Sequence, residues 1–490
     1  MQRITPGPAW PLHDAAATRA IEAAAAASLS PHTLMQRAGE AVARLALALA
    51  PHARTVWVAC GPWNNGGDGF EAASHLASAH RRVVVTCLGD AQALPEDARQ
   101  SLARAQAAGV TFSPEPPEQA DLVIDAILGI GARRALEGRA AQWQARMAQA
   151  TQAGVPVLAI DLPSGLDADT GQGQAVQATH TLSLLTLKPG LFTAQGRDAA
   201  GTIWFDDLAS SDFANAVAAS ATLNPAPIVR PRPHASHKGS WGDVAVIGGA
   251  PGMTGAALLA ARAALYAGAG RVFVGLLAST ETAHAPSALT VDPMQPELMF
   301  RGIATLDPTQ LHIACGCGSG EAVRAELPRI LSRARTLVLD ADALNAIATD
   351  TGLQTLLRAR CARQPDTTVL TPHPLEAARL LGTSTEQVQA DRVRAARALV
   401  ERFGAVSVIK GSGSVIAAPG RVPSINPTGH AGLATAGTGD VLAGLVAARL
   451  ANGLSAIDAA ADAVYTHGAL ADAWPHEQAL VASRLAQRIR

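Results

Sequence analysis

The chain has 490 residues, 48% of them hydrophobic and 16% charged, with 44 glycines. A globular chain of this length exceeds one ordinary core, so two domains are predicted. Basic and acidic residues nearly cancel, 39 against 40, and no basic stripe with interleaved aromatic residues is visible, which argues against a nucleic-acid partner.

The first part of the chain, up to about residue 50, is predicted to be helical. Ser30-Pro31 predicts the capped start of one helix. The apolar residues that follow at helical spacing include Leu34, Ala38, Val42 and Leu45.

From Thr55 onwards, short β-rich runs alternate with alanine-rich helical segments, a pattern typical of a parallel α/β sheet. The predicted strands are residues 55–59, 82–86, 121–125 and 155–161. Because open parallel sheets bind ligands at the carboxyl ends of their strands, we expect a site in the loops that follow. These loops are residues 61–69, 126–134 and 162–165.

A linker is predicted between residues 206 and 240, where periodicity fades and prolines gather. We place the domain boundary near residue 222, which gives domains 1–221 and 222–490. A second α/β series follows, and no short-period repeat is visible. Its predicted strands are residues 242–248, 271–274, 335–340, 367–370 and 406–409.

The five cysteines are an odd number and form no paired zinc-binding pattern, so we expect reduced, mostly packed thiols. They are Cys60, Cys87, Cys315, Cys317 and Cys361. Cys315-x-Cys317 has no second pair nearby, and we assign no metal to it. No apolar run of 18 residues occurs, and Arg19 and Glu22 interrupt the alanine-rich stretch near the N-terminus. We therefore expect a cytoplasmic protein with no membrane partner.

The segment Gly61-Pro-Trp-Asn-Asn-Gly-Gly-Asp-Gly69 is a candidate pyrophosphate cradle, because its backbone N–H groups follow a strand without side-chain obstruction. Its alternative is a simple chain turn. Asp125 and Asp161 end strands, and with Asn65 and Ser164 they offer oxygen ligands for a cation. Strand-end aspartates can also be helix caps.

Four motifs follow one another in this half: Asn64-Asn-Gly-Gly-Asp-Gly69, Asp125-Ala-Ile-Leu-Gly129, Asp161-Leu-Pro-Ser-Gly165 and Lys188-Pro-Gly190. Together they resemble the NAD(P)HX epimerase family over residues 10 to 208. The resemblance implies that Asn65, Asp125 and Ser164 help to hold a potassium ion. It also implies a set of substrate contacts: Asn64, Asn65, Gly66, Gly67, Asp68, Gly129, Ile130, Gly131, Ala132, Arg133, Arg134, Ala135 and Asp161.

Epimerisation at the hydroxylated C6 of a reduced nicotinamide needs an acid/base group that opens and re-forms the aminal. Asp161 is our candidate catalytic group, and Lys188 assists it electrostatically. Gln36 stands where the family usually has glutamate, and the residues before Lys188 also depart from the family pattern.

In the second half, Gly437-Thr-Gly-Asp440 is a glycine turn that leads into an apolar helix. Gly437, Thr438 and Gly439 can direct N–H groups at a phosphate, and Asp440 can accept a proton from a hydroxyl. The alternative is a simple helix cap.

Two further segments of the second half are binding candidates. Lys410-Gly-Ser-Gly-Ser414 joins two β-rich runs and can clasp a nucleotide, or be an ordinary hairpin turn. His373, between two prolines, is a binding candidate or a rigid-turn residue.

Seven motifs follow one another in this half: Ser236-His-Lys-Gly239, Gly248-Gly249 with Thr254-Gly-Ala256, Asp340-Ala-Asp-Ala-Leu-Asn345, Thr371-Pro-His-Pro374, Lys410-Gly411, Asn426-Pro-Thr-Gly429 and Gly437-Thr-Gly-Asp440. Through them, residues 226 to 485 resemble the NAD(P)HX dehydratase family, which is similar to ribokinase-like kinases. The resemblance implies a hydrate site at Ala256, Gly318 or Gly320, His373 and Asp440. It implies a nucleotide site at Lys410, Gly411, Ser412, Gly413, Ser414 and Gly439, to which we add Gly437 and Thr438. Two departures are Gly316-Cys-Gly-Ser-Gly320, for the usual Gly-Pro-Gly-Leu-Gly, and Leu375, for glycine.

These resemblances imply two three-layer α/β domains, the first Rossmann-like and the second ribokinase-like. The expected activity is repair of hydrated NADH and NADPH: epimerisation in the first domain, then dehydration of the S form in the second. The expected cofactors are K⁺ in the first domain and Mg²⁺ with ADP or ATP in the second, where ADP is favoured by analogy with fused bacterial-type members. In the reaction Asp440 deprotonates the C6 hydroxyl, which is phosphorylated and then eliminated.

The leading alternative is a ribokinase-like kinase for a vitamin or small alcohol, since fold does not fix function. A second is a non-catalytic nucleotide sensor, which would not need Asp161, Lys188 and Asp440 together. We also expect a homo-oligomer, although the alanine-rich helices could pack between subunits or within one.

Overall fold

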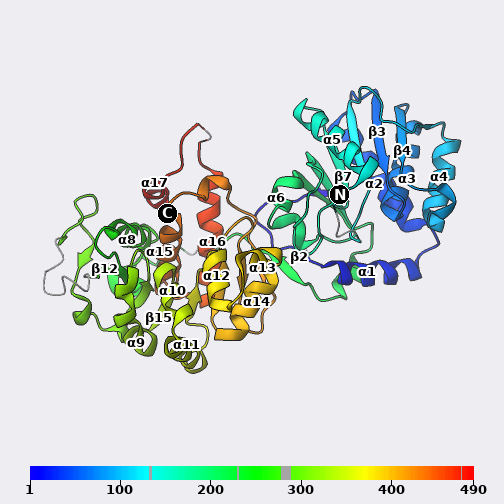
Figure 1. Ribbon diagram of the computed structural model, residues 1–490. Helices are drawn as coiled ribbons and strands as arrows, with labels where there is room; N and C mark the ends of the chain where they lie inside the picture. The colour runs from blue at the N-terminus through cyan, green and yellow to red at the C-terminus, as the bar shows by residue number, and fades with distance from the viewer. Residues whose placement is uncertain (132–134, 229–230, 278–288, 476, 490) are drawn as a thin grey trace. The chain divides into compact units, whose positions relative to one another are not determined.

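The computed structural model describes residues 1–131, 135–228, 231–277, 289–475 and 477–489. It divides into two compact units, Met1–Thr5 with Trp10–Thr222 and Pro6–Ala9 with Leu223–Arg490. The first runs from blue to green in Figure 1 and the second from green to red. Each is built from a mixed α/β sheet with helices, as the sequence predicted.

The first unit is built on one largely parallel sheet. Its strands lie in the order β1-β9-β8-β7-β6-β3-β4-β5, and only the β1 pair is antiparallel among the described strands of this sheet. The bounds are β1 Gln2–Arg3, β3 Thr55–Cys60, β4 Arg82–Cys87, β5 Thr111–Phe112, β6 Leu122–Ala126, β7 Val157–Ile160, β8 His180–Leu184 and β9 Thr202–Asp206. The four predicted strands are confirmed as β3, β4, β6 and β7. A short β2, Pro11–Leu12, pairs antiparallel with β10, Ala221–Leu223.

Helices cover both faces of this sheet, because its strands are apolar on both sides. Val56 and Val58 of β3 face one core, with α2, α3 and α4, while Trp57 and Ala59 face a second core with α5. Figure 1 shows α5 on one side of β3 and α3 and α4 on the other. The helix bounds are α1 Ala15–Ser28, α2 Thr33–Leu49, α3 Asn64–Ser78, α4 Glu96–Ala107, α5 Gly138–Gln152, α6 Gly196–Ala199 and α7 Ser211–Asn215.

Two local predictions in this unit are wrong. The helix expected from Ser30-Pro31 begins at Thr33, and its N-cap is His32, whose backbone is left-handed with φ of +67°. The segment Gly61–Gly69 is not one loop, since α3 begins at Asn64.

The glycines of that segment allow close packing of α3 rather than a free turn. A Cβ on Gly66 would lie 2.0 Å from the Gly61 carbonyl oxygen, and one on Gly69 would lie 2.6 Å from Cβ of Ala126. The first turn of α3 is therefore pressed against the ends of β3 and β6, and it brings its unpaired N–H groups to the edge of the sheet.

The second unit is also built on a largely parallel sheet. Its strands lie in the order β13-β12-β11-β14-β15-β16-β17-β18-β19, parallel as far as β17 and antiparallel after it. The bounds are β11 Asp243–Gly248, β12 Arg271–Leu276, β13 Met299–Phe300, β14 His312–Cys315, β15 Thr336–Leu339, β16 Thr368–Leu370, β17 Val406–Ile409, β18 Val415–Ala417 and β19 Ser424–Ile425. The five predicted strands are confirmed, and β14 is a strand that the sequence analysis missed.

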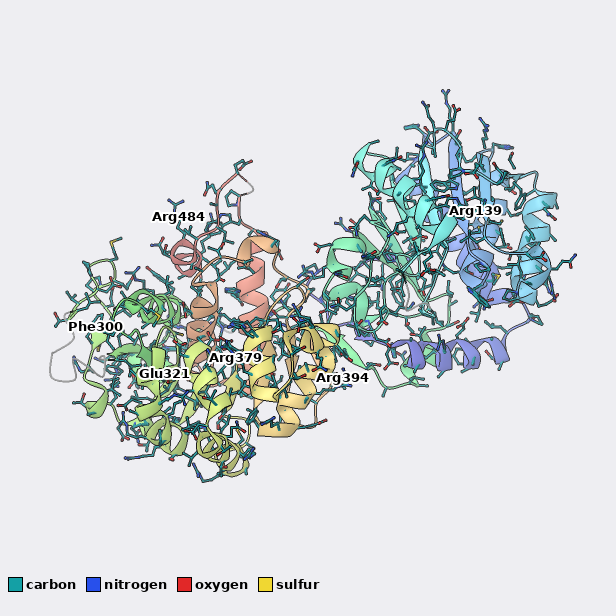
Figure 2. All side chains as sticks on the ribbon, in the orientation of Figure 1. Arg139, Phe300, Glu321, Arg379, Arg394 and Arg484 are labelled. Carbon is teal, nitrogen blue, oxygen red and sulfur yellow. The ribbon has the colours of Figure 1, made fainter. Side chains whose placement is uncertain are left out.

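One face of this sheet packs on α8, α15, α16 and α17 through an alanine-rich core. Helices α9 to α14 pack on one another and, through α14, on β17 and β18. Exposed charges stand on outer helix faces, as with Arg139 of α5 and Arg394 of α14 (Figure 2). The bounds are α8 Thr254–Tyr266, α9 Val323–Arg333, α10 Ala341–Thr349, α11 Thr351–Arg363, α12 Pro374–Leu381, α13 Thr385–Ala390, α14 Arg392–Phe403, α15 Thr438–Ala451, α16 Ala456–Asp472 and α17 Ala482–Gln487.

Strand order reverses once in each parallel sheet, between β3 and β6 in the first unit and between β11 and β14 in the second. At such a point the loops leave in opposite directions and open a crevice at the carboxyl edge.

The described helices include none long and apolar enough to span a membrane. All five cysteines are free, and all but Cys87 are buried, as expected.

The close contact of α15 with α8 gives a test of packing. A Cβ on Gly444 would lie 2.0 Å from the carbonyl oxygen of Ala260, which is backbone and cannot move aside. We expect Gly444→Ala to lower the free energy of unfolding of the second unit by about 1–3 kcal/mol. Gly255→Ala on α8 is the control, because its Cβ would meet open space. Denaturant titration followed by circular dichroism measures both, and equal stability of the two variants would contradict the packing argument.

Candidate active sites

The first unit holds a cavity of about 990 Å³ at the carboxyl edge of its sheet. Its wall combines α1 and α2 with segments that follow β3, β6, β7 and β8. The predicted residues that line it are Asn64, Asn65, Asp68, Gly129, Ile130, Gly131, Asp161 and Lys188. The cavity therefore brings together residues from all four family motifs of this half, with Ile130 and Gly131 of the loop after β6.

Asp161 and Lys188 form an ion pair in the cavity wall, with side chains 14% and 1% exposed. Lys188 Nζ also donates to the carbonyl oxygens of Leu184, at 2.8 Å, and Thr186, at 2.9 Å. Its three protons are thus directed, and Asp161 Oδ1 takes a further hydrogen bond from the Leu184 N–H at 3.1 Å. The carboxylate is held in one place by this set of donors.

Asp161 also has an unusual backbone. Its φ is +65°, in the left-handed region that aspartate tolerates better than most residues, and its N–H donates to the Leu182 carbonyl at 2.8 Å. Such a conformation costs free energy and persists where surrounding contacts enforce it. Here it turns the chain at the end of β7 so that the side chain enters the cavity.

Three more carboxylates, Glu22, Asp68 and Asp97, share the cavity with Asp161. Burial raises the pKa of Asp68 well above its ordinary value, and the charges of Asp161 and Glu22 raise it further. Burial and Asp161 likewise raise the pKa of Glu22, against the opposing charges of Lys188 and Arg19. The sequence analysis missed Glu22 and Arg19 as site residues. Their signal was a polar pair interrupting an alanine-rich helix.

Asp125 and Ser164, predicted as cation ligands, lie behind the cavity and are fully buried. Ser164 donates to Asp125 through its hydroxyl at 2.6 Å and its N–H at 2.8 Å. Asn65 Nδ2 donates to the Leu128 carbonyl at 3.0 Å, and Ser164 Oγ lies 3.3 Å from the same oxygen. The three predicted ligands thus meet around Leu128, where carboxylate, hydroxyl, amide and carbonyl oxygens gather.

The other predicted contacts of this half are not in the cavity wall. Gly66 and Gly67 pack α3 against its neighbours, and Ala135 is exposed and away from the described wall. Ala132, Arg133 and Arg134 lie outside the described residues.

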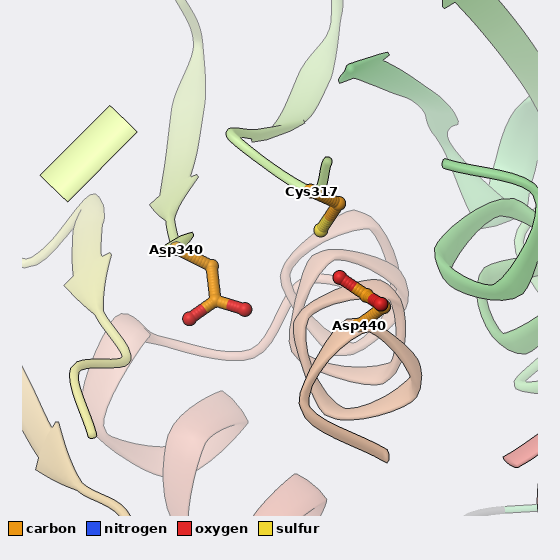
Figure 3. A group of neighbouring side chains, drawn as sticks. All are labelled: Cys317, Asp340 and Asp440. Carbon is orange, nitrogen blue, oxygen red and sulfur yellow. The ribbon is translucent and has the colours of Figure 1, made fainter. Parts of the chain in front are cut away.

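In the second unit Asp440 lies in the first turn of α15, beside Asp340 and Cys317 (Figure 3). One donor atom from each of the three side chains lies within 4.8 Å of the others. Burial and, after it, the charge of Asp340 raise the pKa of Asp440 to about 6, and a hydrogen bond from the Cys317 thiol opposes the shift. This carboxylate changes protonation state near neutral pH.

Asp340 is the centre of a second group of charges, at the end of β15. Its Oδ1 accepts from Lys410 Nζ at 2.7 Å and from Thr371 Oγ1 at 2.9 Å. Glu376 Oε2 lies 4.0 Å from the same ammonium, and burial raises the pKa of Glu376 to about 7. Lys410 is therefore directed toward the carboxyl ends of the strands.

His373 is the N-cap of α12, where its Nδ1 accepts from the Glu376 N–H at 3.2 Å. In return, the Glu376 carboxylate accepts a hydrogen bond from the His373 N–H at 2.8 Å. This reciprocal cap explains a histidine between prolines. Its ring is 46% exposed, so the cap leaves part of it open to a ligand.

The segment Lys410–Ser414 joins antiparallel β17 and β18, so it is a hairpin connection with the predicted lysine at its start. It lies against the glycine turn, because a Cβ on Gly439 would be 3.4 Å from Lys410 Nζ. Gly437 has φ of +89°, and Thr438 Oγ1 donates to the Leu433 and Thr435 carbonyls. Thr438 thus holds the turn in place.

Ala256, Gly318 and Gly320 meet at the start of α8. A Cβ on Gly318 would lie 2.8 Å from the Ala256 Cβ, and one on Gly320 would lie 3.6 Å from the Met253 side chain. Cys317, next in the chain to Gly318, links this wall to Asp440. Ala256 and Gly318 are therefore connected to Asp440 through Cys317, whereas His373 lies with Glu376 at the start of α12.

The sequence analysis missed Cys317, Asp340 and Glu376 as site residues. Asp340 opened one of the family motifs but was given no role in the site, and Glu376 was visible only as the third residue after a histidine cap. Cys317 was treated as half of a Cys-x-Cys pair, but its polar neighbours are Asp340 and Asp440.

Comparison with known proteins agrees with the family resemblance of each half of the chain. A family model described as NAD(P)H-hydrate dehydratase matches residues 244–490, and one described as YjeF-related protein N-terminus matches residues 31–190. The Bifunctional NAD(P)H-hydrate repair enzyme Nnr of Escherichia coli (strain K12) is 36% identical over 473 residues, which cover 92% of this chain and 87% of that protein.

Two further relatives match the second half. The ADP-dependent (S)-NAD(P)H-hydrate dehydratase of Neisseria meningitidis serogroup B is 41% identical over 268 residues, 54% of this chain and 87% of that protein. A solved ADP/ATP-dependent NAD(P)H-hydrate dehydratase from Bacillus subtilis, co-crystallized with ATP/Mg²⁺, is 31% identical. The match covers 53% of this chain and 91% of the Bacillus subtilis chain, with a TM-score of 0.45.

Full-length similarity to the Escherichia coli protein, with a dehydratase family model over half of the chain, settles the family that motifs and geometry had indicated. The chain belongs to the family of bifunctional NAD(P)H-hydrate repair enzymes.

Proposed function

We propose that this chain repairs hydrated NADH and NADPH in two steps. Residues 1–221 interconvert the R and S hydrates at C6, and residues 222–490 dehydrate the S form at the expense of an adenine nucleotide. One observation carries the proposal: each unit holds an aspartate paired with a lysine, Asp161 with Lys188 and Asp340 with Lys410. Each aspartate follows the strand next to the pair at which strand order reverses.

In the epimerase step Asp161 is the acid/base group. Its Oδ1 takes the hydrogen bonds of Lys188 and Leu184, so we assign proton exchange with the C6 hydroxyl to Oδ2. Loss of that proton to Asp161 converts the C6–OH group to an aldehyde as the C–N bond breaks and its electron pair moves to the ring nitrogen. The nitrogen then re-adds to the other face of the aldehyde, and Asp161 returns the proton to the oxygen. Lys188 holds the carboxylate and lowers the cost of its charge beside the dinucleotide.

Potassium is proposed at Asn65, Asp125 and Ser164. The fit rests on Asp125, which is fully buried and hydrogen-bonded by Ser164 and Ile127. No cationic side chain among the described residues contributes to its pKa, which burial raises to about 6. A cation offsets such a buried carboxylate, and oxygen ligands suit a hard ion. A bound ion would supply positive charge beside the pyrophosphate.

In the dehydratase step Asp440 takes the proton of the C6 hydroxyl, and the freed oxygen attacks the terminal phosphorus of the nucleotide. An O–P bond forms at the substrate as the bridging P–O bond of the nucleotide breaks. The ring nitrogen then expels phosphate from C6, and loss of a C5 proton restores the dihydronicotinamide. Lys410 and the Gly437–Gly439 turn stabilise the phosphates, and Mg²⁺ is proposed to arrive with the nucleotide, ADP or ATP.

The overall activity is tested with separated R and S hydrates of NADH and the intact chain. With nucleotide present, both hydrates should restore the absorbance of the reduced ring, the R form only after epimerisation. Without nucleotide, chromatography should show interconversion and no NADH. Formation of a stable phosphorylated vitamin, with no turnover of either hydrate, would favour the kinase alternative instead.

Asp161→Asn should remove the first step alone. Asparagine also tolerates a left-handed backbone, so the fold should survive, but it cannot exchange a proton. We expect epimerisation to fall by about 10²–10⁴-fold. Dehydration of the S hydrate is the internal control and should be unchanged. Full epimerase activity in a folded Asp161→Asn protein would exclude the proposed acid/base role.

The pH profile of dehydration tests Asp440. Since the base must be ionised, and burial raises the pKa of Asp440 to about 6, kcat/KM for the S hydrate should fall as pH drops through this value. Cys317→Ala removes a hydrogen bond that favours the ionised form, so the midpoint should move to higher pH, and Cys317→Ser should restore it. An unchanged midpoint in Cys317→Ala would show that the thiol does not act on Asp440.

A further inference from the structure

Arg392, the first residue of α14, lies directly beneath the Lys410–Ser414 segment. It is 3% exposed. Its Nη1 donates to the Ser412 carbonyl at 2.5 Å and its Nη2 to the Ile409 carbonyl at 3.2 Å. A Cβ on Gly411 would lie 2.8 Å from Nη2, and Gly411 has φ of +138°. The segment therefore rests on the guanidinium group, and glycine is required at the point of contact.

The charge of Arg392 is not balanced by a carboxylate in the described part of the chain. None of the ion pairs found there includes it, and its Nε is buried without a hydrogen-bond partner. Burial alone lowers the pKa of Arg392 to about 10, so the side chain stays charged at neutral pH. Burying an unpaired cation lowers the stability of the folded chain. We therefore expect such a cation to have a compensating anion or a functional role.

Arg360 is a matched case without such a role. It is fully buried, and burial lowers its pKa to about 10 as well. It donates to Thr368 Oγ1 at 2.8 Å and to the Ala334 carbonyl at 2.6 Å. Thr368 begins β16 and Ala334 precedes β15, so Arg360 lies at the amino edge of the sheet, opposite the site. The two arginines therefore differ in position: Arg360 lies at the amino edge of the sheet, and Arg392 lies beneath the Lys410–Ser414 segment.

We propose that Arg392 is a positioning residue for the polyphosphate of the adenine nucleotide. It draws the Ser412 carbonyl inward, and because the peptide is trans, the N–H of Gly413 points away from the guanidinium. Its charge adds a positive potential beneath the segment, where little water screens it. This inference rests on the proposed nucleotide site and adds to it the group that shapes and charges the segment from below.

The test uses the intact chain and two variants of Arg392. Arg392→Gln removes the charge and keeps an amide donor. Arg392→Lys keeps the charge and loses the forked guanidinium group that donates to two carbonyls. Calorimetric titration with MgADP and with MgATP measures binding without turnover. We expect Arg392→Gln to weaken nucleotide binding about tenfold or more, and to raise the KM for nucleotide but not for the S hydrate. Arg392→Lys should recover part of the loss.

Arg360→Gln is the matched control, because it removes an equally buried cation remote from the segment. It should lower the melting temperature and leave nucleotide affinity unchanged. Arg392→Gln with wild-type affinity for both nucleotides, or an equal loss of affinity in Arg360→Gln, would overturn the inference. If Arg392→Gln does not fold, a wild-type nucleotide affinity of folded Arg392→Lys, with its fork lost, overturns the positioning role.

Lys410→Met separates this inference from the proposed function. If Lys410→Met weakens nucleotide binding and Arg392→Gln does not, the nucleotide site stands and the role of Arg392 fails. If neither variant changes nucleotide binding, the nucleotide site itself is wrongly assigned, and the inference fails with it.

Discussion

Each unit depends on a lysine fixed to a strand-end aspartate, Asp161 with Lys188 and Asp340 with Lys410. The chain has only three lysines, and these are two of them. A lysine is a compact charge with three donors, so backbone carbonyls can hold it beside one carboxylate, whereas an arginine fork would need a wider planar partner. Removing either partner would leave a buried charge unpaired, which costs more than the pair itself contributes.

The paired charges decide how the neighbouring acids behave. Asp68 and Glu22 near the first pair, and Asp440 and Glu376 near the second, are half-buried or buried, and burial raises their pKa values. The lysine of each pair lowers some of these shifts but cannot cancel them all. Each site therefore contains one carboxylate held by a lysine and neighbouring acids whose pKa values burial raises, an arrangement that suits proton transfer next to phosphate charge.

The sequence predicted both sheets and the strand-end residues, because strands, turns and catalytic motifs are local in the chain. It failed where a residue acts through tertiary packing. Glycines at 66 and 69 were expected to free the backbone for a phosphate, but they admit α3 against β3 and β6. Glu22 and Arg392 belong to no local sequence motif. The role of Glu22 is visible only from the cavity that it lines, and that of Arg392 only from its hydrogen bonds to the Lys410–Ser414 segment.

The departure at Gly316–Gly320 changes the side-chain chemistry of a family loop whose backbone is held by its own contacts. Gly249 N–H donates to the Cys317 carbonyl at 2.9 Å, and a Cβ on Gly316 would lie 1.9 Å from the Asp340 carbonyl oxygen. These contacts fix the backbone whatever side chain stands at 317. A proline there has no hydrogen to offer, but the thiol reaches Asp440 and favours its ionised form. The replacement therefore acts on the strength of the proposed base rather than on the shape of the site.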